Sequence, residues 1–430
     1  AEEVRLQFTV HGPVVHLDTR SLKAFAVRAA WLEPGMAPYL GSLGYLGAGD
    51  VKEFREALNQ WGAPGSNQIS ADTDGHISWT PRALVPIRPN WDGLLPVPGD
   101  GRYEWSGFRH PDELPTVVDP PSGWLATANE MNLPTDGTWA PIPVSYEWFA
   151  PFRADRIRDV LGSDQSHTID ASAALQNDYV SVAAGRLLDL LPSDSCDDPD
   201  AAWALGLLRM WDRRMAADSV GAGVFEAWSF GELRLQLYRS AVGELVAEDE
   251  VAAAMRIVVP EVPAHRDSVL DIQLLSRLAP AELAALVEMT LGATVRRLTR
   301  ELGADRSSWT HGRAIVSRLA HPLAELIDDP PSWMKLGPDP KSGSFQTVGV
   351  TTYDPTTGIQ NGGASFRMVI DVGSWDDSIA ISTPGQSGDP RSPHFDDLYG
   401  RWLADEYVPL VYSPEAIARN TRTVTHLHPR

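Results

Sequence analysis

The stretch GWLATANEMNLP, residues 123–134, places a carboxamide, Asn129, at the end of a short apolar run. A strand that stops on a polar amide, in a chain rich in Trp and Pro, can form the rim of a reaction site. The same residue type is also common where a chain enters a loop, because its short side chain hydrogen-bonds the nearby backbone. From the residues alone, Asn129 is therefore either part of a reaction site or an ordinary loop residue.

The other residue types that carry chemistry form no complete set. Histidines such as His110 and His394 have no partners at metal-ligand spacing, and no HExxH or CxxC pattern occurs. Cys196 is the single cysteine, which excludes an internal disulfide, and its acidic neighbours do not activate a thiolate. The glycines of 41–50 lack the Lys-Ser or Lys-Thr of a phosphate loop, and there is no GxSxG nucleophile elbow. These patterns indicate an aromatic-rich α+β protein without a recognisable catalytic set.

The composition is that of a folded globular chain of 430 residues. Apolar residues make up 43% and there are 15 Trp, which argues against disorder in spite of a net charge of −21. The acid excess argues against nucleic acid and anionic membranes as partners, because both require a basic face. No apolar run is long enough to span a membrane, and the first residues, AEEVRLQFTV, do not form a signal peptide.

Hydrophobic alternation predicts strands in the first part of the chain, at 4–10, 14–18, 25–31, in a hairpin over 67–81 and again at 123–129. Apolar residues at helical spacing predict a helix over 49–61 with Asp50 as its N-cap. Residues 82–122 are rich in Pro, Gly and Trp without periodicity, which indicates a long ordered surface segment that its aromatic residues anchor. We therefore expect residues 1–150 to form a β-rich part of the core.

The middle of the chain changes to helical periodicity at about residue 153, and this pattern continues into the segment 311–327. Strand signals resume after residue 340, at 344–354, 364–373 and 377–383. The expected organisation is a helical region over 151–335 and a return of β strands, with a C-terminal tail, over 336–430.

Several segments, in the same order, resemble the penicillin acylase family of N-terminal-nucleophile amide hydrolases. They are HGPVV (11–15), APGSNQISADTDGHISW (63–79), LLPVPGDGRYEWSGFRHPDELPTVVDPPSGWLATANEMNLP (94–134), FRADRIRDVL (152–161), LQNDYVSVAAGRLLDLL (175–191), LLRMWDRRMAADSVGAGVFEAW (207–228) and GASFRMVIDVGSWDDSIAISTPGQSGDPRSPHFDDLY (363–399). The likeness runs over nearly the whole chain. It implies an α+β fold, the four-layer αββα sandwich of N-terminal-nucleophile hydrolases, incomplete on this chain and carrying a large helical insert.

The resemblance also assigns roles to four residues. TAN at 127–129 matches the motif in which the family places its oxyanion-hole Asn, which implies that Asn129 donates to the developing oxyanion. Arg156, in RADRI, matches an Arg that lies near the amine of the nucleophile, with a helix-surface ion pair as the alternative. Ser66 and Asn67 fall where the family partly lines its acyl pocket. The His11-Gly12 turn is interpreted as architectural.

One departure from the family pattern concerns the nucleophile. In the family it is the first residue of the large chain, usually Ser, and its own α-amine serves as the base. This chain begins with Ala1, and its first match, HGPVV, corresponds to a region well inside the large chain. A companion polypeptide would then carry the nucleophile across an obligate interface above roughly 2,000 Å². A fragment and a noncatalytic descendant are the alternatives.

The resemblance implies an amidohydrolase that cleaves linear N-acyl amides of small molecules through an acyl-enzyme. No cofactor is required for that chemistry. A structural calcium ion is implied as an option, with only carbonyl positions around Gly93 matching on this chain. Export to the periplasm or the medium is expected from the family, with a cytoplasmic location as the alternative. Two other readings stay open, a catalytically silent scaffold that binds an acylated ligand and a carbohydrate surface on Trp91, Trp105 and Trp148.

Overall fold

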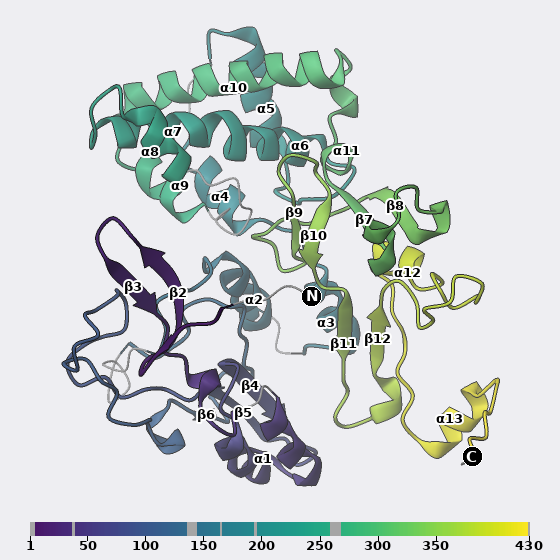
Figure 1. The fold of residues 1–430 in the computed structure, drawn as a ribbon. Helices are drawn as coiled ribbons and strands as arrows, with labels where there is room; N and C mark the ends of the chain where they lie inside the picture. Colours follow the sequence, from purple (N-terminus) through teal and green to yellow (C-terminus); the bar gives the residue numbers. More distant parts are fainter. Residues whose placement is uncertain are drawn as a thin grey trace. The chain divides into compact units, whose positions relative to one another are not determined.

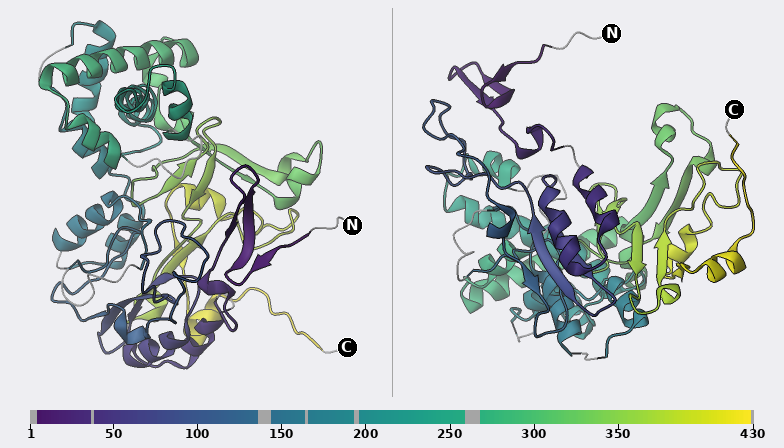
Figure 2. Two further views of the ribbon diagram at one scale, coloured as in Figure 1. Left: turned by 60° about the vertical axis from the view of Figure 1, so that its left-hand side comes forward. Right: turned by 90° about the horizontal axis from the view of Figure 1, so that it is seen from below.

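The computed structural model describes residues 5–36, 39–135, 144–163, 166–192, 196–258 and 268–428. The chain divides into two compact units, Ala1–Trp148 and Phe149–Arg430. Figure 1 labels the helices and strands of both units, and Figure 2 gives two further views.

The first unit is built mainly of short antiparallel strands. Its elements are β1 (Phe8–Thr9), β2 (Gly12–Asp18), β3 (Lys23–Ala26), α1 (Val51–Ala57), β4 (Ser66–Ala71), β5 (Ile77–Arg82) and β6 (Val117–Val118). The strands form two three-stranded sheets, in the orders β1-β2-β3 and β4-β5-β6. The hairpin of β2 and β3 is the purple ribbon of Figure 1. At its start Gly12 has φ +126°, and a Cβ there would meet the carbonyl oxygen of Val27 at 2.1 Å, so the turn requires glycine.

The hairpin predicted over 67–81 is confirmed and has a regular register. Ser66 pairs with Arg82, Asn67 with Pro81 and Ile69 with Trp79. The residues of β5 are almost all buried, whereas β4 is partly exposed along its length. β5 is the central strand of its sheet, with β4 on one side and β6 on the other, which explains why it is the more buried of the two hairpin strands.

The helix predicted over 49–61 is also confirmed, in a shorter form. The Asp50 side chain accepts a hydrogen bond from the backbone N–H of Glu53, so Asp50 is the N-cap. The α-helix ends at Ala57, and a 3-10 turn over Leu58–Gln60 follows it. Leu58, at the start of the 3-10 turn, and Trp61, which follows the turn, are both buried.

Three strand predictions in this unit are wrong in part or as a whole. Of the described residues in the segment 4–10, only Phe8–Thr9 form a strand. The segment 25–31 leaves the sheet after Ala26 and contains a 3-10 turn over Ala30–Leu32. In the described part of the chain, no strand pairing includes residues 123–129. Alternating apolar residues indicate alternating burial, but an extended backbone becomes a strand only where a neighbour completes the ladder of hydrogen bonds.

The second unit contains most of the helices. They are α2 (Phe152–Ser163), α3 (Ile169–Gln176), α4 (Val182–Leu188), α5 (Pro199–Met210), α6 (Val220–Ala227), α7 (Arg234–Gly243), α8 (Val251–Val258), α9 (Val269–Leu275), α10 (Pro280–Leu302), α11 (His311–Ala314), α12 (Tyr399–Leu403) and α13 (Pro414–Asn420). Helices α5 to α10 gather in one cluster, which Figures 1 and 2 show in teal and green. Among the described residues, no helix is long and apolar enough to cross a membrane.

Helix α10 is the longest of these and lines the main core. Its residues Val287, Leu291 and Val295 recur four apart and are fully buried, as an amphipathic helix requires. They pack in one cluster with Trp228, whose indole N–H donates to Thr290 Oγ1 at 2.9 Å. The cluster is formed by residues that the sequence predicts as helical.

The strands of the second unit form small antiparallel sheets. They are β7 (Val316–Ala320), β8 (Lys335–Pro340), β9 (Thr351–Tyr353), β10 (Gln360–Gly363), β11 (Phe366–Val369), β12 (Ile379–Ser382) and β13 (Val408–Pro409). β7 pairs with β8, β9 with β10, and β12 lies between β11 and β13. Strands do return near the C-terminus, but the strand predicted over 344–354 is limited to Thr351–Tyr353.

The prediction of helix over 311–327 is wrong for most of that segment. Only His311–Ala314 is α-helical, and the strand β7 begins two residues later. Val316 pairs with Pro340 and Ala320 with Lys335, so the partner strand lies far along the chain. A local hydrophobic pattern cannot show such a partner, and the pairing decides the structure here.

Candidate active site

The loop that carries Asn129 turns sharply at this residue. Asn129 has φ +65°, the left-handed region that few residues other than Gly, Asn and Asp adopt readily. Its neighbours Ala128 and Glu130 are buried, with Glu130 only 2% exposed, whereas Asn129 is exposed. The Glu130 carboxylate accepts a hydrogen bond from the backbone N–H of Ala128 at 2.8 Å. This buried contact closes the turn around the exposed residue Asn129.

A second contact fixes the loop three residues further along. The side-chain N–H of Asn132 donates to Asn67 Oδ1 at 3.1 Å. The same oxygen accepts from the indole Nε1 of Trp79 at 2.8 Å. The Asn67 carboxamide oxygen thus accepts hydrogen bonds from Trp79, in the hairpin β4–β5, and from Asn132, in the loop that carries Asn129. It joins the hairpin to this loop.

The two predicted pocket residues have different surroundings. Asn67 is half-buried and its oxygen is used in this network. Ser66 is exposed at the start of β4, and its hydroxyl donates to the carbonyl oxygen of Asn67 at 3.3 Å. The geometry thus gives Asn67 a positioning role, while Ser66 presents a small polar surface.

Arg156 lies in α2 and forms an ion pair with Asp178. Its Nε and Nη2 both donate to Asp178 Oδ2, at 2.9 Å and 2.6 Å. The other carboxylate oxygen accepts from the backbone N–H of Val180 at 2.7 Å. The Asp178 side chain is 9% exposed and that of Arg156 is 29% exposed. The pair is therefore partly desolvated, and the guanidinium direction is set by a carboxylate that is held on both oxygens.

Helix α2 itself is anchored by its first turn. Phe152 and Ala154 are buried, and the Arg186 guanidinium of α4 lies 5.4 Å from the centroid of the Phe152 ring. Arg186 also donates to Asp155 at 2.6 Å. Arg156 therefore follows directly on the part of the helix that these contacts fix.

The four predicted residues are distributed over both units. Asn129, Ser66 and Asn67 belong to the first unit, with Asn67 bonded into the Asn129 loop, and Arg156 belongs to the second. Two contributing residues were missed from the sequence, Asn132 and Asp178. No local signal marks either one, because each acquires its role through a contact with a distant segment.

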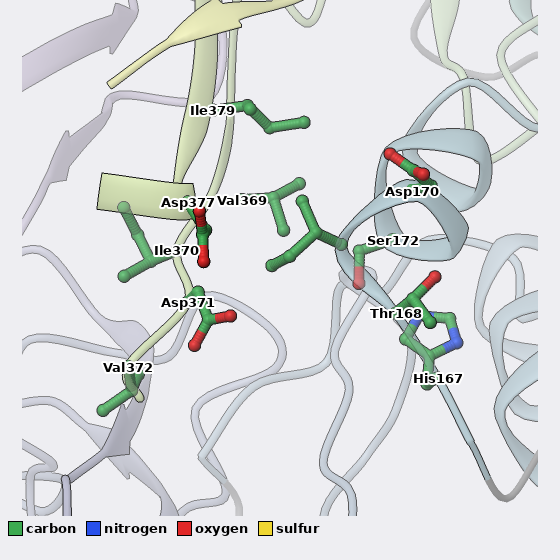
Figure 3. A pocket seen from close by; sticks show the side chains of 11 residues that line it. His167, Thr168, Asp170, Ser172, Val369, Ile370, Asp371, Val372, Asp377 and Ile379 are labelled. Carbon is green, nitrogen blue, oxygen red and sulfur yellow. The ribbon is translucent and has the colours of Figure 1, made fainter. Parts of the chain in front are cut away.

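Two surface hollows occur elsewhere, and none of the four predicted residues lines them. One, of about 700 Å³, lies between the start of α3 and the strands β11 and β12. Figure 3 shows Thr168, Asp170 and Ser172 on the helix side and Asp371 and Asp377 on the strand side. Asp371 uses Oδ1 to accept from the backbone N–H groups of Gly373 and Ser374, both at 2.9 Å, so it serves its own turn.

The second hollow lies in the first unit, beside the β2–β3 hairpin, and is lined by aromatic residues. His11 Nε2 lies 2.6 Å from Glu104 Oε1, which ties the turn before β2 to the Pro/Gly-rich segment and agrees with an architectural role. Trp91 and Trp105 are half-buried, and the Arg88 guanidinium lies 5.4 Å from the centroid of each ring. That cation covers part of the ring surface that a sugar would need.

The structure leaves the expected calcium ion untested. The described residues contain no group of three or more His, Cys, Asp or Glu arranged to hold a metal ion. Asp92, next to Gly93, accepts two hydrogen bonds, each at 3.0 Å. Its side-chain Oδ1 accepts one from the backbone N–H of Leu94, and its backbone carbonyl oxygen accepts one from the Tyr146 hydroxyl. These oxygens have protein donors rather than the open geometry that calcium requires. Calcium binding stays a prediction from the resemblance.

The fold belongs to the class of N-terminal-nucleophile hydrolases. A crystal structure titled thermostable penicillin G acylase from Alcaligenes faecalis aligns with a TM-score of 0.68, over 99% of this chain and 78% of that one, at 21% identity. This confirms the predicted α+β fold. The sequence pattern of the family described as penicillin amidase matches residues 1–419, and the chain belongs to that family.

Two curated relatives extend this finding. The penicillin acylase 2 proenzyme of Pseudomonas sp. strain SE83 is 30% identical, over 98% of this chain and 54% of its own length. The acyl-homoserine lactone acylase QuiP of Pseudomonas aeruginosa is 27% identical, over 86% of this chain and 47% of its own length. The chain thus spans about half the length of the curated relatives that it matches.

Proposed function

We propose that this chain is part of an enzyme that hydrolyses N-acyl amides through an acyl-enzyme. The observation that carries the proposal is the position of Asn129 at the left-handed turn of a loop held by side-chain contacts of the neighbouring Glu130 and Asn132, within a chain of the penicillin amidase family. A rigid neutral donor is suited to stabilise charge that appears only in the transition state, since it needs no reorganisation when the charge develops.

In this proposal the attacking hydroxyl comes from the first residue of a companion polypeptide. Its oxygen forms a bond to the amide carbonyl carbon, and its proton passes to the α-amine of the same residue. The carbonyl oxygen becomes an oxyanion, which accepts a hydrogen bond from the side-chain N–H of Asn129. The C–N bond then breaks as the leaving amine takes the proton, and water hydrolyses the resulting ester by the same steps in reverse.

Arg156 has an electrostatic role in the proposal. A guanidinium near an amine disfavours the protonated amine and so keeps it available as a base at neutral pH. The ion pair with Asp178 prevents the guanidinium from turning elsewhere, because both Nε and Nη2 are engaged with one carboxylate oxygen.

Exposed apolar side chains on the β1–β3 sheet support the companion polypeptide. Phe8 in β1 is 66% exposed and Leu17 in β2 is 52% exposed, and Val10, in the turn between these strands, is 93% exposed. β1 and β3 are edge strands of this sheet, with backbone groups available for further pairing. A stable soluble protein covers apolar surface of this kind, so we expect the companion to extend or cover the sheet.

The proposed substrates are small molecules that carry an acyl group on nitrogen. The relatives named above are a penicillin acylase and an acyl-homoserine lactone acylase, and these names give the first substrates to test. Ser66, exposed at the start of β4, is proposed to contribute to the acyl pocket. Export to the periplasm or the medium is proposed on family grounds and is tested by cell fractionation.

The experiment that tests the proposal begins with the natively purified protein. Intact mass measurement identifies the chains that co-purify and shows whether one begins with Ser, Thr or Cys. The complex is then assayed for release of the free amine from penicillin G and from an N-acyl-homoserine lactone. Turnover by the complex, and none by this chain alone, is the expected result. A complex that binds these ligands without releasing amine would instead support the silent scaffold.

A further inference from the structure

A short segment near the C-terminus holds the chain on both sides of Asp178. The hydroxyl of Tyr179 lies 2.7 Å from each carboxylate oxygen of Asp405. The Tyr407 hydroxyl donates to Gln176 Oε1 at 2.8 Å and accepts from the side chain of Asn177 at 3.2 Å. The two residues before Asp178 and the one after it are thereby tied to Asp405 or Tyr407.

The backbone at Asp178 is fixed as well. Its carbonyl oxygen accepts from the N–H of Gly349 at 2.9 Å, and the carbonyl oxygen of Tyr179 accepts from Met215 N at 2.8 Å. A Cβ at Gly349 would lie 2.5 Å from Cε1 of Tyr179, so the ring packs directly against the glycine. The Asp178 carboxylate therefore starts from a backbone that has little freedom to move.

Asp405 is itself oriented by its surroundings. It has φ +60° in the turn after α12, which sets the direction of its side chain. Arg367, whose side chain is 5% exposed, donates to Asp405 Oδ1 at 3.3 Å. Burial, together with the Asp405 charge, raises the pKa of Tyr179, so the Tyr179 hydroxyl remains a donor at all ordinary pH values.

We propose that Asp405 and Tyr407 are positioning residues for Arg156. Asp405 acts through Tyr179 and Tyr407 acts through Gln176 and Asn177, and together they hold Asp178 where it aligns the guanidinium. The proposal rests on the proposed function in one respect, the contribution of Arg156 to turnover. Its geometric part, the immobilisation of Arg156 by residues more than 200 positions away, can be tested without any activity.

Three variants of the intact, natively assembled protein separate the contacts. Tyr179→Phe removes one hydroxyl and keeps the buried ring, Tyr407→Phe does the same at the second contact, and Asp405→Asn removes the charge. Asp389→Asn is the matched control, because Asp389 is a surface carboxylate that pairs only locally with Arg391. The two tyrosine variants are the conservative ones and keep the test valid if Asp405→Asn folds poorly.

The first measurement is nuclear magnetic resonance on protein with isotope-labelled arginine. Rotation about the Nε–Cζ bond of Arg156 is slow when both Nε and Nη2 are bonded, and the Arg156 signal is assigned as the one lost in Arg156→Lys. We expect this rotation to accelerate in the three variants and to stay slow in Asp389→Asn. Unchanged rotation of Arg156 in all three variants overturns the proposal, whether or not the protein is an amidase.

The second measurement is a double-mutant cycle on turnover of the N-acyl amide. We expect Tyr179→Phe to lower kcat by about 10-fold with KM within about twofold, because misplacement of an aligned group affects mainly the chemical step. In an Arg156→Ala background the same change should have no further effect on kcat. Equal losses in both backgrounds would assign Tyr179 a general structural role and reject the link to Arg156.

Discussion

The carboxamide oxygen of Asn67 accepts a hydrogen bond from the side chain of Asn132 at 3.1 Å. This contact joins the first strand of a buried hairpin to the loop that presents Asn129. It turns a residue expected in a binding pocket into part of the support of the proposed oxyanion donor.

Replacement of Asn129 should reduce turnover without unfolding the protein. Loss of one oxyanion donor lowers kcat by about 10²- to 10³-fold. Asn129→Ala and Asn129→Gly should lose similar activity, but Ala should also cost about 1 kcal/mol of stability because it resists the positive φ. Amine release and urea denaturation measure the two effects. Asn90→Ala is the control on an exposed Asn of the same unit, and near-normal kcat in Asn129→Ala would contradict the assignment.

Removal of the shared acceptor should loosen the Asn129 loop. Asn67→Ala leaves the buried indole N–H of Trp79 and the amide of Asn132 without this oxygen, which costs about 1–3 kcal/mol. Asn67→Asp retains an oxygen at the same position and should lose less. The midpoint of urea unfolding ranks the variants. Equal midpoints for both variants and the wild type would show that the contact does not stabilise the loop.

Substitution of Arg156 by Lys should show whether turnover depends on the positive charge at this position or on the geometry of the guanidinium group. Arg156→Lys keeps the positive charge but cannot engage Asp178 through Nε and a second nitrogen together, so we expect kcat to fall. The stability cost should be about 1 kcal/mol, since the pair is partly exposed. Arg158→Lys, on the same helix in an exposed pair with Asp155, should leave both quantities nearly unchanged. A fall in kcat of the same size in Arg158→Lys would point to the helix as a whole.

Stability should depend on pH through Lys341. Its side chain is 2% exposed, with Nζ 4.5 Å from the centroid of the Trp402 ring, and burial lowers its pKa to about 8, against the opposing effect of Asp405. Arg367 is the other charged group that acts on it, and it lowers the pKa further. Between pH 8 and the ordinary Lys value, the unfolded chain binds more protons than the folded one. Stability contributed by this site therefore rises with pH in that window.

The Lys341→Met variant isolates this effect. The difference in unfolding free energy between wild type and variant should increase by roughly 2 kcal/mol from pH 8 to pH 10 in favour of the wild type. Other titrating groups, such as Tyr179, contribute to both proteins and cancel in the difference. Urea unfolding of the two proteins at several pH values measures it. Parallel pH profiles would mean that Lys341 titrates as an exposed lysine does.

The hairpin, the capped helix and the helical region were predictable because their determinants are local. The turn at Asp74-Gly75 and the alternation on either side specify β4 and β5, and Asp50 is read as an N-cap from its place before an apolar face. Asn129 and Arg156 are proposed as site residues from ordered motifs of a family to which the chain belongs.

The tertiary structure decided what those residues do. Residues 123–129 have strand-like alternation but no strand partner in the part of the chain that the structure describes, and Val316–Ala320 became a strand because residues 335–340 pair with it. Asp178, Asn132 and Asp405 carry no local signal, since each is defined by a partner between 22 and 226 positions away. A linear pattern records the periodicity of burial along one segment, whereas hydrogen bonds and ion pairs depend on which distant segments the folded core brings together.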